Sequence, residues 1–183
     1  MTATRSNRLA LTFLLLLGWV GAGQASGERL PGAAIVSPNG KWQVASQEPP
    51  EGSDAHRIVL VDKSIGATTT IDRFSRHAEV LWSGDSERIA ITDYFASDES
   101  DCRVVARSGA DPRSIREAIK GTRLEKIVES NHHAYITCRR WVTPSVVEFE
   151  IAAYGDGNPK GVKSRGRLDI ATGEIGSITP QKK

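Results

Sequence analysis

V-L-W-S-G-D-S-E-R-I-A-I-T-D, at Val80–Asp93, contains two β-strands joined by a tight polar turn. The first strand is apolar, and the second alternates isoleucine with small or polar residues, the period expected of a strand with one buried face. Weaker copies stand on either side. Ser37–Ala45 (S-P-N-G-K-W-Q-V-A) aligns without gaps 46 residues earlier, and Trp141 aligns with Trp82 at a distance of 59 residues. The chain is therefore built from about three copies of one β-unit.

The units occupy about residues 31–76, 78–130 and 131–178 of a single domain, 26–183. Each adds strands beyond the hairpin, such as the β-branched run R-I-V-L-V-D in the first unit, which indicates a buried strand. The first and third units each end in a further strand–turn–strand pattern. We expect residues 26–32 to be a frayed lead-in to the first unit.

A helical pattern interrupts the second unit at residues 111–130 and lengthens it. Asp111 suits the N-cap of a short helix, and Pro112 suits its first position. After a break, Thr122 and Glu125 form a capping-box pattern for a second short helix. Because the apolar face is short, we expect this insertion to pack against the sheets.

The N-terminus has the pattern of an export signal over residues 1–25. Arg5 and Arg8 precede an apolar run, Leu9–Val20, and small residues up to Ala25 suit a signal peptidase. The run of 12 residues is shorter than the roughly 20 that a membrane-spanning helix needs. We therefore expect a periplasmic or secreted protein with no stable membrane span after cleavage.

Charge limits the partners. The 24 basic and 22 acidic residues become 22 of each once Arg5 and Arg8 are removed, which argues against nucleic-acid binding. The charge is uneven, however. Residues 26–101 carry 7 basic and 13 acidic residues (net −6), and residues 102–183 carry 15 and 9 (net +6). Either the fold intermixes the two halves, or the molecule is dipolar and attracts a charged partner.

Cys102 and Cys138 remain in a chain predicted to reach an oxidising compartment. Strand alternation places both on the more apolar side of a predicted strand, Cys102 with Val104 and Cys138 with Ile136. We favour a disulfide between them, with two buried free thiols as the alternative.

S-P-N-G-K-W with V-L-V-D, then L-W-S-G-D-S-E-R-I-A-I, then L-D-I-A-T-G-E, resemble the WD40-like propeller repeats of periplasmic Tol-type and prolyl-oligopeptidase-type proteins. The resemblance covers most of residues 31–178 and implies four-stranded, blade-like units. The chain departs from the family at Gly84 and Ser86, which replace its Pro and Gly, and at Pro144-Ser145 in the third copy.

Closed propellers typically need four to eight blades, and this chain has about three units. Blade-like units bury their faces only against neighbours. We therefore predict an all-β fold of antiparallel, blade-like repeats with a small helical insertion. It forms an open stack, a partner-completed assembly or, as we expect, a compact sandwich-like monomer with a helical cap.

Catalytic machinery is not recognisable. The prolyl-oligopeptidase-type nucleophile elbow, G-x-S-x-G, is missing. His132-His133 with Cys138 could suggest a metal site or a Cys–His pair, but consecutive histidines in a strand point to opposite faces, so we expect one semi-exposed and one packed imidazole. We predict no catalytic, cofactor-binding or metal-binding residues.

Two sets of residues suggest binding. The acidic loop 97–101 with upstream Asp93 offers Asp98, Glu99 and Asp101 to a partner, and we take these four carboxylates as the candidate binding loop, with loop 47–56 as a second surface. Trp42, Trp82 and Trp141 could form a stacking surface, but at equivalent strand ends they are expected in the core.

The sequence thus favours a non-enzymatic protein- or ligand-binding or scaffold module of the cell envelope, without a cofactor. A small periplasmic hydrolase or lyase with an unrecognised site is the alternative, and a self-associating structural component is a third hypothesis. The oligomeric state and the identity of the partner stay open at this stage.

Overall fold

The fold is seen in a computed structural model that describes residues 27–110, 112–155 and 158–180. The export signal predicted at residues 1–25 lies outside the described residues. Among those that are described, no helix is long and apolar enough to cross a membrane.

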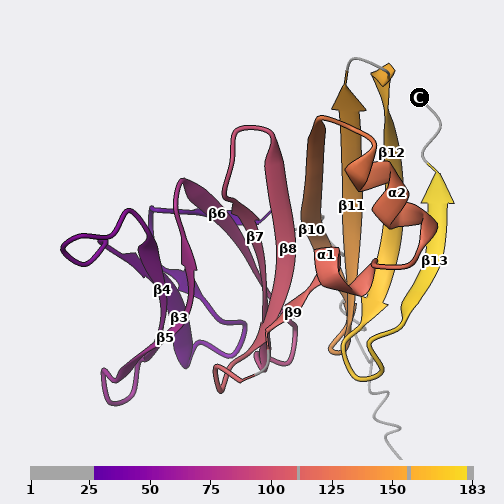
Figure 1. Cartoon of the computed structure of the whole chain (residues 1–183). Coiled ribbons are helices and arrows are strands. Elements are labelled where there is room, and N and C mark those ends of the chain that lie inside the picture. The colour runs from indigo at the N-terminus through magenta and orange to yellow at the C-terminus, as the bar shows by residue number, and fades with distance from the viewer. Residues whose placement is uncertain (1–26, 111, 156–157, 181–183) are drawn as a thin grey trace, which may run out of the picture.

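Antiparallel strands make up three successive four-stranded units, which we call blades, and two short helices interrupt the chain after the second (Figure 1). The first blade contains β2 (Ile35–Val36), β3 (Trp42–Gln47), β4 (His56–Asp62) and β5 (Thr68–Phe74). The second contains β6 (His77–Trp82), β7 (Arg88–Tyr94), β8 (Glu99–Ala106) and β9 (Arg113–Ser114). The third contains β10 (His133–Thr143), β11 (Val146–Gly155), β12 (Asn158–Asp169) and β13 (Ile175–Pro180). Outside this pattern lie β1 (Glu28–Leu30), α1 (Ile115–Ala118) and α2 (Arg123–Glu129).

The blades stand side by side in a row that does not close (Figure 1). The second and third are joined where β8 and β10 pair in parallel, with Glu99 opposite Ala134 and Ser100 opposite Tyr135. The predicted all-β fold with a helical insertion is confirmed, and the units form the open stack rather than the sandwich. The row places most of the acidic half toward the first blade and most of the basic half toward the third, and the two halves form ion pairs where they meet in the second blade.

Two apolar cores hold the row together, one on each face of the second blade. The first core lies between the first and second blades, and the second core lies between the second and third. Alternation along β7 supplies both, because Ile89 and Ile91 face the first blade while Ala90 faces the third. The helices fill the space beside the third blade, with Ile115 and Leu124 buried in the second core.

The hairpin turns of the first two blades repeat the same hydrogen bonds. In each, a buried serine donates to the side chain two residues on and accepts from the backbone N–H five residues on. The two sets are Ser37, Asn39 and Trp42, and Ser83, Asp85 and Arg88. Gly40 and Ser86 occupy the same turn position with φ of 72° and 63°. The gapless alignment at 46 residues is therefore confirmed in three dimensions.

Two local predictions were wrong. Residues 28–30 are not a frayed lead-in, because β1 pairs with β6 and Leu30 is fully buried in the first core. Pro112 is not the first helical residue either. The chain first pairs as β9 with β8, and Ser114 then caps α1 by accepting a 3.1 Å hydrogen bond from the backbone of Glu117. Asp111 lies outside the described residues.

The predicted cap of the second helix is confirmed. Thr122 accepts a hydrogen bond of 3.1 Å from the backbone of Leu124 at the start of α2. The carboxylate of Glu125 binds the backbone N–H of Gly121 at 2.7 Å, one residue before the position that a regular capping box would use.

Candidate binding site

The predicted disulfide is confirmed. Cys102 on β8 and Cys138 on β10 are bonded, with Cα atoms 5.3 Å apart, and both lie in the core between the second and third blades. Buried hydrogen bonds lie beside it. Thr92 accepts from the backbone of Cys138 at 2.9 Å, and Ser100 donates to the carbonyl of Ile136 at 3.1 Å. The β8–β10 junction is therefore the most strongly cross-linked boundary of the row.

Two of the four carboxylates in the candidate binding loop are buried within strands. Asp93 on β7 and Asp101 on β8 lie directly opposite each other in the sheet. Asp101 accepts a 2.7 Å hydrogen bond from Ser114 and a 3.1 Å bond from the backbone of Arg116, so it fixes the start of α1. The loop is thus shorter than predicted, since β8 begins at Glu99.

Arg103 connects the first and second blades. Its guanidinium lies 2.8 Å from the carboxylate of Asp93 and 3.0 Å from that of Asp72 on β5, and it donates to the carbonyl of Arg73. Burial raises the pKa of Asp72, Asp93 and Asp101, while Arg103 opposes that rise. No signal in the sequence indicated that Arg103 would contact Asp72 and Asp93, because the three residues lie on three strands and are up to 31 residues apart.

The other two carboxylates of the loop lie at the surface. Glu99 pairs with Arg116 at 3.3 Å, and Asp98 contributes its carbonyl to a 2.9 Å hydrogen bond with the backbone of Ala134. Arg116 also lies over the ring of Phe95, with its guanidinium carbon 5.8 Å from the ring centre. The phenyl ring of Phe95 remains 40 % exposed. We call Phe95, Asp98, Glu99 and Arg116 the rim cluster.

Aromatic side chains continue from the rim cluster onto the third blade. Tyr135 donates a 2.7 Å hydrogen bond to the carbonyl of Ser97. The ring of Tyr154 stacks on that of His133, with centres 4.5 Å apart, and lies 6.2 Å from that of Tyr135. The sequence pattern drew attention to His133 only as half of a histidine pair, and not to Tyr135 or Tyr154, because each tyrosine looks like an ordinary strand position until β10 and β11 pair.

The two consecutive histidines lie at the start of β10, with His132 in the bend before the strand and His133 as its first residue. His132 is exposed, and His133 packs on Tyr154. Across the described ranges, no group of three or more His, Cys, Asp or Glu residues could hold a metal ion. Both imidazoles make ring contacts, His132 edge-on to His133 and His133 stacked on Tyr154.

The three tryptophans lie where the core interpretation predicted. Trp42 and Trp82 pack on the first core and Trp141 on the second. Trp82 and Trp141 donate hydrogen bonds to the preceding blade, and Arg107 lies 4.5 Å over the ring of Trp42. They are therefore elements of blade packing rather than a stacking surface for a ligand.

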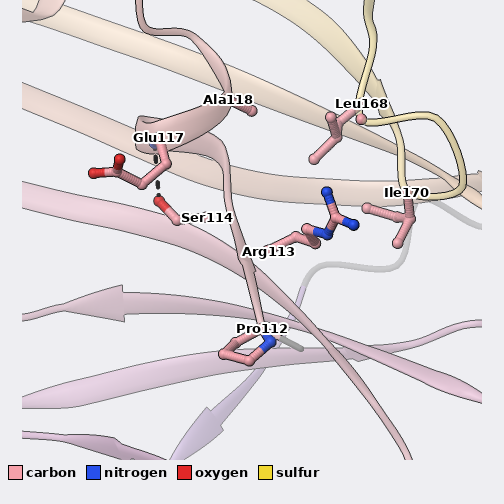
Figure 2. Close-up of a pocket in the computed structure, with 8 residues that line it drawn as sticks. Pro112, Arg113, Ser114, Glu117, Ala118, Leu168 and Ile170 are labelled. Carbon is pink, nitrogen blue, oxygen red and sulfur yellow. Dashed lines mark hydrogen bonds between the residues drawn. The ribbon is translucent and has the colours of Figure 1, made fainter. Parts of the chain in front are cut away.

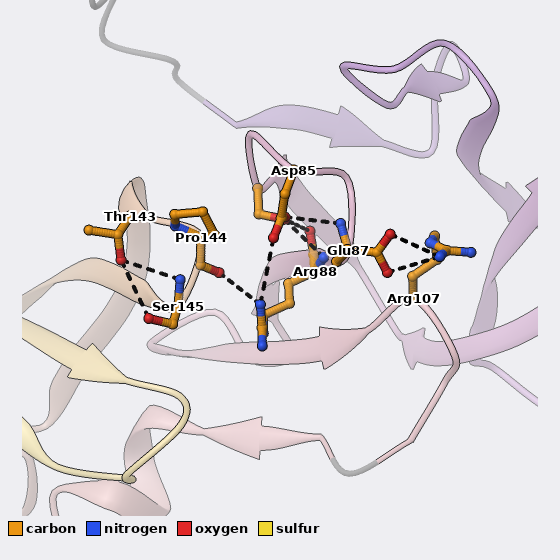
Figure 3. Close-up of polar contacts among 8 residues, drawn as sticks. Asp85, Glu87, Arg88, Arg107, Thr143, Pro144 and Ser145 are labelled. Atoms are coloured by element: carbon orange, nitrogen blue, oxygen red, sulfur yellow. Dashed lines mark hydrogen bonds and ion pairs between the residues drawn. The ribbon is translucent and has the colours of Figure 1, made fainter.

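At the other end of the blades, the hairpin turns contact one another (Figure 3). Arg88 donates to the carbonyl of Pro144 at 3.1 Å, which joins the second and third turns. Arg107 forms two hydrogen bonds with the carboxylate of Glu87, at 2.9 and 3.0 Å. The backbone of Asn39 donates to the hydroxyl of Ser86, which joins the first and second turns. The Arg88 and Asn39 hydrogen bonds join blades, whereas the Glu87–Arg107 pair lies within the second blade.

A cavity of about 300 Å³ lies between the start of α1 and the turn after β12 (Figure 2). Leu168 and Ile170 form part of its wall, and Arg113 extends toward them. The carboxylate of Glu117 points away from Arg113 (Figure 2). The two charged side chains of the cavity, Arg113 and Glu117, therefore do not point at a common position, as a general acid and a general base would.

Comparison with known proteins shows the fold. No protein-family model matches the chain, and no curated protein matches its sequence. Among solved structures, the chain is similar to an oligogalacturonate lyase in complex with manganese, with 15 % identity and a TM-score of 0.55 over 83 % of this chain and 42 % of that one. It is also similar to the β-propeller domain of the Trilobed protease from Pyrococcus furiosus, with 11 % identity and a TM-score of 0.54 over 83 % and 43 %.

A looser likeness links the chain to TolB from Acinetobacter baumannii, with 14 % identity and a TM-score of 0.42 over 86 % of this chain and 45 % of that one. The chain thus spans less than half the length of these propeller structures. At such identities the likeness to the lyase and to the protease domain shows a propeller-like fold and no specific function.

Proposed function

We propose that the protein is a non-enzymatic binding module of the cell envelope that takes a protein partner at the rim cluster. The observation that carries the proposal is Phe95, a large ring left 40 % exposed on a loop and held in place by Arg116. Aromatic and arginine side chains are the commonest anchors of protein interfaces. Asp98 and Glu99 provide charge beside that anchor.

A rigid scaffold supports the rim cluster. Arg116 is fixed by Glu99, by the carbonyl of Ser100 at 3.2 Å and, through its backbone, by Asp101. The disulfide closes the strand pair directly behind the loop. Preorganisation of this kind lowers the entropy lost on binding and favours recognition over loop rearrangement.

The proposed location rests on two features. The apolar run Leu9–Val20 follows two arginines as in an export signal, and the disulfide suits an oxidising compartment such as the periplasm. The alternative of a small hydrolase or lyase has less support, because the converging carboxylates Asp72, Asp93 and Asp101 are occupied by Arg103 and Ser114 at a blade boundary.

Site-specific photo-crosslinking tests the proposal. A photoreactive amino acid replaces Phe95 in the full chain expressed with its own export signal, and Ile65, which is 76 % exposed in the turn after β4, is the matched control. We expect one discrete adduct at position 95, lost when Asp98→Lys and Glu99→Lys are added. No adduct at position 95, or the same adduct at position 65, would reject the rim cluster as the binding surface.

A further inference from the structure

The outer face of the third blade differs in kind from the equivalent face of the second. In the second blade, Leu81, Ala90 and Val104 form one row across β6, β7 and β8, and this apolar row packs against the third blade. The equivalent row of the third blade crosses β10, β11 and β12. Its residues are Arg140, Glu148 and Arg167, which pair directly across the strands.

The equivalence is fixed by register. Leu81 precedes Trp82, and Arg140 precedes Trp141, the tryptophan that makes the same contact one blade later. The apolar row with which the second blade contacts its neighbour is therefore replaced, in the third blade, by a row of ion-paired residues. Arg140 lies 3.1 Å and Arg167 3.6 Å from the carboxylate of Glu148. A polar outer face is what a terminal repeat requires.

This face carries more positive charge than its ion pairs use. The next rows place Arg165 beside Glu150 at 3.2 Å, and then Lys163 beside Ala152. Lys163, Arg165 and Arg167 alternate along β12, so their positions are about 6.6 Å apart on one face. With Arg140, four cations face the two carboxylates Glu148 and Glu150. The excess belongs to the basic end of the molecule.

Tyr154 stands at the upper end of the same face, beside a groove of about 220 Å³ whose lining includes Lys160, Gly161 and Lys163. The residue is 41 % exposed, and its ring stacks on that of His133. Gly161 has φ of 67°, and a Cβ there would lie 3.2 Å from the Cβ of Tyr154, so glycine allows this close approach. The groove is smaller than the roughly 300–1,000 Å³ that encloses a drug-sized ligand, and it suits one ring of a chain lying across the surface.

Recognition on this face must come from side chains. The strands β11 and β12 are each paired on both sides, so they offer no free edge to an extended peptide. What the face does offer is an exposed aromatic ring beside a line of cations. We infer that the outer face of the third blade binds an acidic oligosaccharide, with one sugar ring against Tyr154 and its carboxylates along Lys160, Lys163 and β12.

The test is titration of the full chain with an alginate oligosaccharide, a polymer of uronic acids, followed by calorimetry. Neutral dextran and poly-glutamate serve as comparison ligands. We expect alginate to bind measurably, poly-glutamate at least tenfold more weakly, and dextran more weakly still. Added salt should weaken alginate binding, because exposed charges are screened. This surface shares no residue with the rim cluster, so the two proposals can fail separately.

Matched variants locate the site. K160A/K163A should lower alginate affinity at least tenfold, and Tyr154→Ala should do the same without changing the salt dependence. Lys63→Ala, in an exposed turn of the first blade, should leave affinity unchanged. Absence of alginate binding, equal binding of poly-glutamate, or an equal loss in Lys63→Ala would each overturn the inference. Since both lysines are exposed, K160A/K163A keeps the test valid if Tyr154→Ala unfolds.

Discussion

The indole nitrogen of Trp141 donates a hydrogen bond of 3.2 Å to the backbone carbonyl of Leu81, across the boundary between the second and third blades. Trp82 makes the same bond, also at 3.2 Å, with the carbonyl of Ile35 across the boundary between the first and second. Each blade is thus fixed to its predecessor by a repeated tryptophan, and this contact explains why the motif recurs in the sequence.

Replacement of this indole by a phenyl ring should destabilise the fold modestly. Trp141→Phe leaves the carbonyl of Leu81 without its donor, and we expect a loss of about 1–2 kcal/mol in the free energy of unfolding. Trp82→Phe should behave alike. Urea unfolding measures the effect, with Trp42→Phe as the control because none of the described hydrogen bonds involves the Trp42 indole. An equal loss in all three variants would show that ring volume, not the hydrogen bond, is responsible.

The hairpin turns and the apolar faces of the strands were predicted well from the sequence, because the contacts that form them are local or periodic. The turn at Ser83 is held by partners within five residues, and strand alternation alone put Cys102 on an apolar face. Longer-range pairings were not predictable. Leu30 is buried only because β1 pairs with a strand some 50 residues later, and nothing near Arg103 announces its contact with Asp72.

The same distinction applies to the candidate site. The acidic stretch near residue 98 was visible in the sequence, but strand pairing decides which carboxylates reach the surface. Asp93 and Asp101 are buried within strands, whereas Asp98 lies before β8 and Glu99 is its first residue, so both remain partly exposed. Phe95 was not singled out because the sequence does not show that β7 ends at Tyr94. Without that boundary, an exposed phenylalanine in the loop looks the same as a buried one in the strand.

Loss of Arg103 should be the most disruptive single charge change between the first two blades. Arg103→Met would leave Asp72 and Asp93 without their shared cation, and we expect a loss of about 3 kcal/mol, the low end for a buried pair because Arg103 remains 26 % exposed. Arg103→Lys should lose less, since it keeps the charge but not both contacts. Chemical denaturation at neutral pH measures both. A loss of under about 0.5 kcal/mol for Arg103→Met, the scale of ordinary surface substitutions, would contradict the assigned role.

The buried carboxylates should also set part of the pH dependence of stability. Because burial raises the pKa of Asp72 above its ordinary value, the folded state binds more protons than the unfolded chain, and this contribution to stability falls as pH rises through the raised pKa. Asp72→Asn should therefore flatten a decline in the unfolding midpoint that begins as pH rises above the ordinary aspartate pKa of 3.8.

Glu148 supplies a control of opposite sign. Its hydrogen bond with Arg140 lowers its pKa, so its contribution is present at neutral pH and lost as pH falls through the lowered pKa. Glu148→Gln should flatten the acid side of the profile instead. If the two variants shift the profile in the same direction, the assignment of Asp72 is wrong.

The disulfide should contribute strongly to stability. It closes a loop with a sequence separation of 36 residues, for which chain entropy gives about 3–4 kcal/mol. The double variant C102A/C138A should lose about that much in urea unfolding, and thiol labelling of the unmodified protein after denaturation should find no free cysteine. Labelling of two thiols would contradict the pairing directly.

The charged row Arg140, Glu148 and Arg167 should keep the third blade from associating with other sheets. The triple substitution R140L/E148A/R167V restores the apolar residues that the second blade has in the same register, and it creates an uncovered apolar face. We expect concentration-dependent dimers or aggregates in sedimentation velocity. The control E117A/K120L removes an exposed ion pair on the helical insertion and should leave the mass unchanged. If the triple variant keeps the mass of the parent protein at every concentration, the ion-pair row is not what ends the stack.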